Sequence, residues 1–163
     1  MISIEPMLSN QAEQILAVYK QGIDTGIATF ETGLPTWATF NERHHTHSRL
    51  VAVEDGDVCG WATLSPVSAR KCYSGVAEVS VYVRLNEQGK GIGKRLLNEL
   101  ILESEKNGIW SLLSVIDEEN SASIHIHTMS GFRIIGYRER IAQQNQKWRT
   151  TVMMERRSLV VGI

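Results

Sequence analysis

Apolar residues follow two spacings along this chain, and the spacing changes from segment to segment. Alternating or continuous apolar runs predict seven strands, near residues 2–4, 50–53, 58–64, 76–83, 109–116, 133–141 and 147–156. Apolar residues three and four apart predict helices over 12–23 and 92–101, with shorter helices around 37–40 and from 120 to about 131. This order of elements predicts one mixed α+β domain without an internal linker.

Capping and turn residues support these boundaries. Ser9 is a candidate N-cap of the first helix, and Asn120 of the last. Asp55-Gly56 predicts a tight hairpin turn, and Asn107-Gly108 predicts the end of the long helix. In strand 76–83, Ala77 and its alternate neighbours share an apolar face, so Glu78 lies on the opposite face.

Composition excludes several classes of protein. The 163 residues include 17 Lys and Arg against 18 Asp and Glu, a net charge of −1, which argues against a nucleic-acid partner. No apolar run approaches the roughly 20 residues of a membrane helix, and no signal peptide is visible at the N-terminus. We therefore expect a cytoplasmic protein without a membrane partner, with Cys59 and Cys72 reduced.

A glycine-rich turn, Gln88-Gly89-Lys90-Gly91-Ile92-Gly93, separates the clearest strand from the clearest helix. Glycines at a helix N-terminus let backbone N–H groups converge on a phosphate, and Lys90 and Lys94 add positive charge. The spacing matches neither a P-loop nor a Rossmann fingerprint. The turn is therefore a different phosphate cradle or an ordinary glycine-rich connection.

The pattern Gln88-x-x-Gly91-x-Gly93 resembles the acetyl-CoA pyrophosphate loop of the GNAT N-acetyltransferase superfamily. Asn120, Ser123 and Gly131-Phe132 are similar to the signature on that superfamily's late helix. The resemblance implies the GNAT fold, a mixed central sheet flanked by helices, and acetyl-CoA as co-substrate. The cofactor-binding residues that it implies are Val81, Tyr82, Val83, Gln88, Gly89, Lys90, Gly91, Ile92, Gly93, Lys94, Asn120 and Ser123.

Further stretches, including residues 19–31, 60–62, 70–73 and 131–148, resemble the phosphinothricin and methionine sulfoximine N-acetyltransferase branch. The resemblance extends to about Ser158, so we expect one domain over 1–158 followed by a short tail, 159–163. It implies a homodimer that acetylates the free amine of a small amino acid or amino-acid-like toxin. Thr150 stands where the branch often has Asp.

The chemistry needs a base, because an α-amine with a pKa of roughly 8 is mostly protonated at neutral pH. The resemblance assigns this role to Glu78; an ion-paired surface carboxylate is the alternative. His127 takes the place where many GNAT enzymes carry a tyrosine acid. It is either an acid that protonates the leaving thiolate or a packing residue of the helix.

Acceptor recognition needs a cation for the anionic group and apolar walls. The resemblance indicates Arg70 or Lys71 for the anion, with Tyr73, Phe30 and Glu31 lining the site. Arg70 is equally compatible with a surface charge. His44, His45 and His47 lack the partners of a metal site, so no metal is expected. Two alternatives stay open: an acetyltransferase for a protein N-terminus or polyamine, and a non-catalytic acyl-CoA-binding module.

Overall fold

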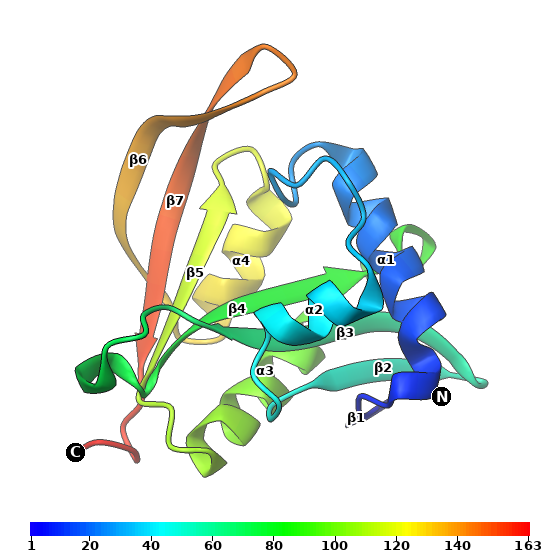
Figure 1. Cartoon of the computed structure of the whole chain (residues 1–163), viewed down its shortest axis with the longest axis horizontal. Helices are drawn as coiled ribbons and strands as arrows, with labels where there is room; N and C mark the ends of the chain where they lie inside the picture. Colours follow the sequence, from blue (N-terminus) through cyan, green and yellow to red (C-terminus); the bar gives the residue numbers. More distant parts are fainter.

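The computed structural model describes residues 1–163 and contains one seven-stranded sheet in the order β1-β2-β3-β4-β5-β7-β6 (Figure 1). The strands are β1 (Ser3–Pro6), β2 (Leu50–Glu54), β3 (Asp57–Pro66), β4 (Val76–Val83), β5 (Ser111–Asp117), β6 (Arg133–Gln144) and β7 (Lys147–Arg157). Only the β4–β5 pair is parallel. The predicted α+β class and mixed sheet are confirmed.

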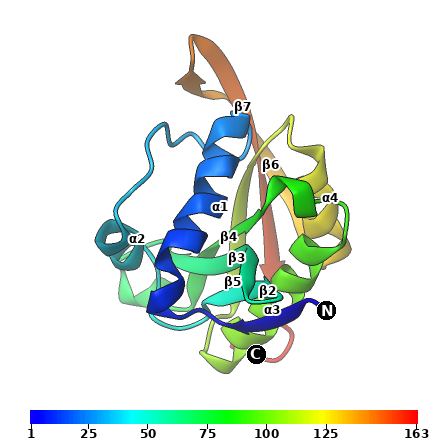
Figure 2. The ribbon, with the colours of Figure 1, turned by 90° about the vertical axis from the view of Figure 1, so that its right-hand side faces the viewer.

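Helices cover both faces of the sheet. They are α1 (Ala12–Thr25), α2 (Trp37–Arg43), α3 (Ile92–Lys106) and α4 (Ser121–Met129). Figure 2 shows α1 and α2 on one side of the strands and α3 and α4 on the other. Each side has its own apolar core: Ile15, Phe40 and Trp61 are fully buried under α1 and α2, while Leu96 and Leu100 of α3 are fully buried on the opposite face.

The two parallel strands separate after a short contact. Residues Val76–Glu78 of β4 pair with Ser111–Leu113 of β5, and the pairing ends there. Beyond that point β4 stays paired with β3, and β5 stays paired with β7 (Figure 1). Because backbone N–H and C=O groups of a strand point alternately to its two sides, part of the β4 backbone beyond Glu78 has no neighbouring strand to bond with. The sheet therefore opens into a wedge that starts at Glu78.

The caps differ in part from expectation. Asn120 caps α4 as predicted, since its Oδ1 accepts a hydrogen bond from the Ser123 N–H at 3.2 Å. The prediction for Ser9 is wrong: Ser9–Gln11 forms a 3₁₀ turn, and the Gln11 side chain accepts from the Leu8 N–H at 2.8 Å. The Gln11 side chain, three positions after Leu8, thus satisfies the N–H of the residue that precedes the 3₁₀ turn, as the third helical residue of a capping box does.

The chain contains no helix that is long and apolar enough to cross a membrane. After β7 the last residues turn back on the body of the domain. The Arg157 guanidinium donates hydrogen bonds to the carbonyl oxygens of Trp110, Val161 and Gly162 at 2.6 to 3.0 Å.

Candidate active site

A cleft of about 1130 Å³ occupies the wedge between β4 and β5. The α3 N-terminus and α4 line one part, and α1, α2 and the loop between them line the other. Most of the predicted site residues meet here: Phe30, Glu31, Glu78, Val81, Tyr82, Val83, Gln88, Gly89, Gly91, Ile92, Gly93, Lys94, Asn120, Ser123 and His127 all line it. Four predicted residues do not: Arg70, Lys71, Tyr73 and Lys90.

The glycine-rich turn has the geometry of an anion cradle. Gly89 and Gly91 have φ values of +81° and +78°, which residues with a side chain rarely adopt. The helix α3 starts directly after Gly91, and no side chain caps its free N–H groups. These N–H groups and the positive end of the helix dipole are therefore available to a phosphate group.

The two lysines of this turn differ. Lys94 lines the cleft. Lys90 lies outside it and forms a 2.6 Å ion pair with Glu87, which raises the pKa of its ammonium group. Lys94 is thus the lysine of the turn that faces the cleft.

Glu78 sits where β4 and β5 part. It pairs with Leu113 of β5 on one side and with Ser65 of β3 on the other, and its side chain is half-buried. Burial raises the pKa of the Glu78 carboxyl, and the positive charge of Arg138 opposes this shift. A carboxylate with a raised pKa at the head of an open cleft is a stronger base than a solvated one.

His127 is buried and carries a defined tautomer. Its Nδ1 lies 2.7 Å from the Ser123 carbonyl oxygen, which can only accept, so Nδ1 carries a proton. Its Nε2 lies 3.0 Å from the Ser114 hydroxyl, which donates to the neutral ring. Burial lowers the pKa of this histidine. The ring also contacts Phe132 edge-on, with the ring centroids 4.9 Å apart, so its orientation is held from three sides.

Aromatic rings form the wall of the cleft on the α1 side. Tyr82 stacks on Trp61, with centroids 4.7 Å apart, and meets Tyr19 edge-on at 5.0 Å. The Tyr82 hydroxyl donates to the Ala28 carbonyl at 3.3 Å, which ties β4 to the loop between α1 and α2. On this side the cleft is lined also by Phe30, Glu31 and Arg43.

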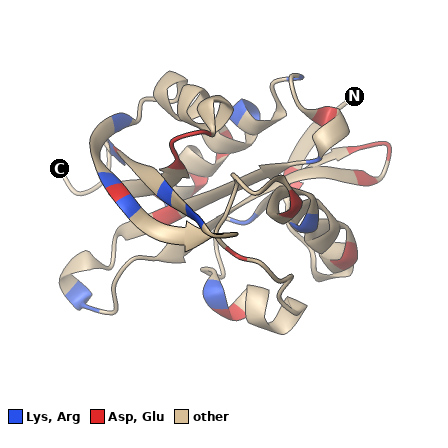
Figure 3. Ribbon diagram, turned by 90° about the horizontal axis from the view of Figure 1, so that it is seen from above, with Lys and Arg blue, Asp and Glu red and all other residues tan.

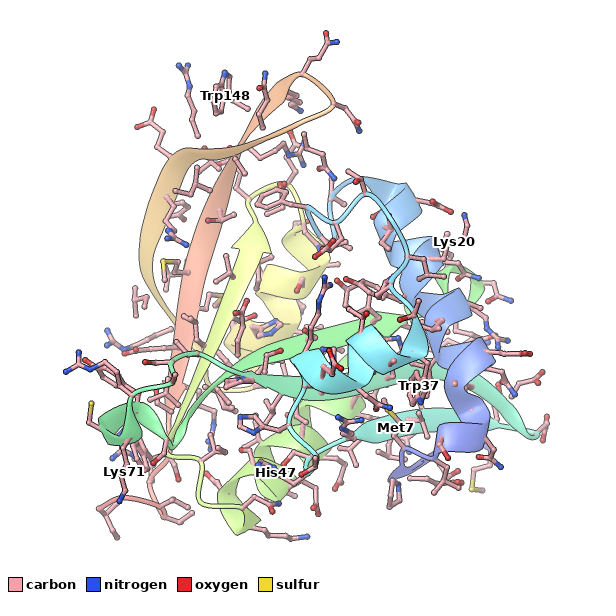
Figure 4. The ribbon with its side chains drawn as sticks, viewed as in Figure 1. Met7, Lys20, Trp37, His47, Lys71 and Trp148 are labelled. Carbon is pink, nitrogen blue, oxygen red and sulfur yellow. The ribbon has the colours of Figure 1, made fainter.

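The loop before β4 is placed elsewhere. Lys71–Tyr73 forms a 3₁₀ turn, and the Arg70 guanidinium lies 5.5 Å from the centre of the Tyr73 ring. Figure 4 shows Lys71 at the edge of the molecule opposite α1. Within this single chain, the structure does not bring Arg70, Lys71 and Tyr73 together with Glu78.

Sequence reasoning missed Arg43 and Ser114, which both line the cleft. Ser114 had a signal, because it is the one polar residue inside the apolar run 112–116. Arg43 had none, because its position depends on how the preceding loop folds. No cluster of three or more His, Cys, Asp or Glu side chains could hold a metal ion.

Comparison with known proteins identifies the family of this chain. The family model described as "Acetyltransferase (GNAT) family" matches residues 15–132. The chain belongs to the GNAT acetyltransferase family. It is an acetyl-CoA-dependent N-acetyltransferase with the GNAT fold, as the sequence predicted.

Several relatives of this chain are named for small amino-acid-like substrates. An L-methionine sulfoximine/L-methionine sulfone acetyltransferase of Pseudomonas aeruginosa is 30% identical over 147 residues, 86% of each chain. A phosphinothricin N-acetyltransferase of Alcaligenes faecalis is 32% identical over 149 residues, 87% of this chain and 75% of the relative. A GNAT phosphinothricin acetyltransferase of Sinorhizobium meliloti, solved with acetyl-CoA, superposes with a TM-score of 0.89 at 28% identity, covering 96% of this chain and 88% of that one.

Proposed function

We propose that this GNAT enzyme transfers the acetyl group of acetyl-CoA to the free amine of a small amino acid or amino-acid-like toxin. The observation that carries the proposal is the single cleft lined by both Glu78 and the glycine-rich cradle. The named relatives support the acceptor class, since they acetylate methionine sulfoximine, methionine sulfone and phosphinothricin.

The residues of the cleft suit acetyl-CoA. In our proposal the N–H groups at the start of α3, with Gln88 and Lys94, bind the pyrophosphate of the co-substrate. The free backbone of Val81–Val83 hydrogen-bonds its pantetheine arm, and Asn120 and Ser123 complete the opposite wall. When bound, acetyl-CoA supplies a thioester whose carbonyl an amine can attack.

Glu78 is the proposed base. It takes a proton from the acceptor ammonium, directly or through a water molecule, and leaves the free amine that can attack the thioester. The burial of Glu78 supports this role because it raises the proton affinity of the carboxylate. The positive charge of Arg138 opposes that rise in pKa and so favours the ionised carboxylate that a base requires.

His127 fits a positioning role better than an acid. Its Nδ1 proton is engaged by the Ser123 carbonyl, and burial disfavours the charged ring that an acid would need. A CoA thiol with a pKa near 8.5 is a tolerable leaving group without protonation. We propose that His127 fixes Ser114 and the first turns of α4 around the cleft.

A second copy of the chain is the proposed partner. The edge strand β6 exposes Ile134, Ile135, Tyr137 and Ile141, and β7 exposes Trp148. An unpaired edge strand with exposed apolar side chains is normally covered in a soluble protein. Figure 3 shows charges of both signs on the β6–β7 hairpin, which suits a self-complementary contact between two copies.

A thiol-release assay tests the proposed activity. Purified protein with acetyl-CoA and L-methionine sulfone should release free CoA faster than the same mixture without acceptor. The N-acetylated amino acid should appear in the same amount as the released thiol. Release that does not depend on any amino-acid acceptor would contradict the proposal.

A further inference from the structure

The acceptor side of the cleft is the part lined by α1, α2 and the loop between them, which contains Phe30 and Glu31. It contains one permanently charged cation. Of the arginines and lysines, only Lys94 and Arg43 line the cleft, and Lys94 belongs to the glycine-rich cradle at the α3 N-terminus. His44, next to Arg43, also lines the cleft, but burial lowers its pKa and its Nδ1 is hydrogen-bonded to the Phe40 carbonyl at 2.7 Å. Arg43 is therefore the permanent cation that lines the cleft on this side; Arg138, whose charge acts on Glu78, does not line it.

The Arg43 side chain is only lightly engaged. Its one hydrogen-bond partner is Glu31, with Nη1 and Oε1 3.2 Å apart. About half of each side chain is exposed, 50% for Arg43 and 45% for Glu31. A guanidinium has five N–H donors, so a single contact leaves most of its capacity free. An ion pair this exposed contributes little to stability and can be exchanged at low cost.

The pair lies close to the proposed site of reaction. Tyr82 belongs to the same strand as Glu78, and its hydroxyl contacts the Ala28 carbonyl in the loop that carries Glu31. Glu78 and Tyr82 are four residues apart on β4, so their side chains share one face of the strand, and both line the cleft together with Glu31. An acceptor whose amine faces Glu78 can therefore extend along Tyr82 toward Arg43.

We propose that Arg43 binds the carboxylate or phosphinate of the acceptor, and that this anion replaces Glu31 on the guanidinium. The inference rests on the proposed function and names the residue that selects anionic acceptors. Glu31 occupies the guanidinium when no acceptor is bound. A neutral or cationic amine cannot displace Glu31, so it gains nothing from Arg43 and binds more weakly.

Kinetics with a matched pair of acceptors test this assignment. The pair is L-methionine sulfone and its α-carboxamide, which keeps the amine and the side chain but lacks the negative charge. Arg43→Ala should raise the KM for the acid by about 10- to 150-fold, the loss of one charge-assisted hydrogen bond, and should change the KM for the amide little. Arg43→Lys should recover part of the loss, and the KM for acetyl-CoA should stay the same.

Two further variants distinguish direct anion binding by Arg43 from an indirect effect of its loss. Glu31→Gln should lower the KM for the acid, since it removes the competing carboxylate; if Glu31 merely supported Arg43, this KM would rise. Lys20→Ala is the control, because Lys20 forms an exposed ion pair with Asp24 on α1 and does not line the cleft (Figure 4). It should leave both KM values unchanged.

A binding readout accompanies the kinetics. L-methionine sulfone should raise the melting temperature of the wild type in the presence of CoA, and this rise should disappear in Arg43→Ala. If Arg70→Ala raised the KM for the acid and Arg43→Ala did not, the inference would be overturned and the proposed function would stay intact. A wild type that acetylates the amide as well as the acid would overturn the inference alone. One that acetylates neither of them, nor methionine sulfoximine, nor phosphinothricin, would overturn both.

Discussion

At the scale of single residues, the sequence predicted the positions of residues that belong to regular strands and helices. Glu78 could be assigned to a strand face by alternation, and the structure puts it where β4 and β5 separate. Arg70 and Arg43 show the limit of this reasoning. Arg43 ends the short helix α2, and Arg70 comes directly before a 3₁₀ turn. Neither periodicity nor capping indicates which of these two segments folds over the cleft.

Replacing Glu78 with Gln tests the base at this scale. The substitution keeps size and hydrogen bonding but removes the proton acceptor, so kcat should fall by about 10²- to 10⁴-fold at neutral pH. The deficit should shrink at high pH, where the acceptor amine is already free. In the wild type the acid limb of kcat/KM should lie above the usual range of a glutamate, because burial raises the Glu78 pKa and activity is lost as the pH falls through that value.

Glu119→Gln is the matched control for that experiment. Glu119 also lines the cleft, but its carboxylate is ion-paired with Lys147 at 2.7 Å, which lowers its pKa. Its loss should leave the pH–rate profile close to wild type. A Glu78→Gln protein with an unchanged profile would instead make Glu78 a structural carboxylate.

At the scale of elements, the bounds of strands and helices were predictable to within a few residues. The point at which β4 and β5 stop pairing was not. The predicted strand 109–116 begins at Ser111, a small shift at its boundary. The opening between β4 and β5 has no sequence pattern, because it depends on where pairing stops after Leu113. Thr150 gains a local role: its hydroxyl accepts a hydrogen bond from the Arg140 N–H at 3.0 Å, where the β6–β7 register shifts.

The glycine-rich turn allows a prediction at this scale. A Cβ atom added at Gly91 would meet no other atom within 4 Å, so a small side chain there would point into open space. Gly91→Asp and Gly91→Asn impose the same backbone strain and differ only in charge. The Asp variant should bind CoA at least about 10-fold more weakly than the Asn variant in calorimetric titration, because its carboxylate repels the pyrophosphate. Equal affinities of the two folded variants for CoA would contradict the assignment of the pyrophosphate site to this turn.

At the scale of the whole molecule, the order of predicted strands and helices indicated a mixed α+β fold, and the chain forms one continuous seven-stranded mixed sheet. The composition could not indicate which strand would lie at the edge of the sheet with its apolar side chains exposed to solvent. Ile134, Ile135, Tyr137 and Ile141 of β6 are apolar residues of the kind that predict a strand, yet all four are exposed. Their exposure follows from the position of β6 at the edge of the sheet.

Oligomeric state tests the proposed role of this edge. Tyr137 is 61% exposed on β6, and Leu102 is 51% exposed on α3. Tyr137→Glu should shift the mass measured by light scattering from two chains toward one, since it places a charge in the proposed contact. Leu102→Glu, with a similar exposure on a distant helix, should stay dimeric. A wild type that is monomeric at micromolar concentrations would exclude this partner.

The most direct measurement compares classes of acceptor under one set of conditions. Wild-type protein, acetyl-CoA and equal concentrations of methionine sulfoximine, methionine sulfone, phosphinothricin, spermidine and a short peptide are followed by thiol release. We predict that at least one of the three amino-acid-like compounds has the highest kcat/KM, with spermidine and the peptide at least about 10-fold lower. A higher kcat/KM for spermidine or the peptide than for all three would contradict the proposed acceptor class, while leaving the acetyltransferase fold unchanged.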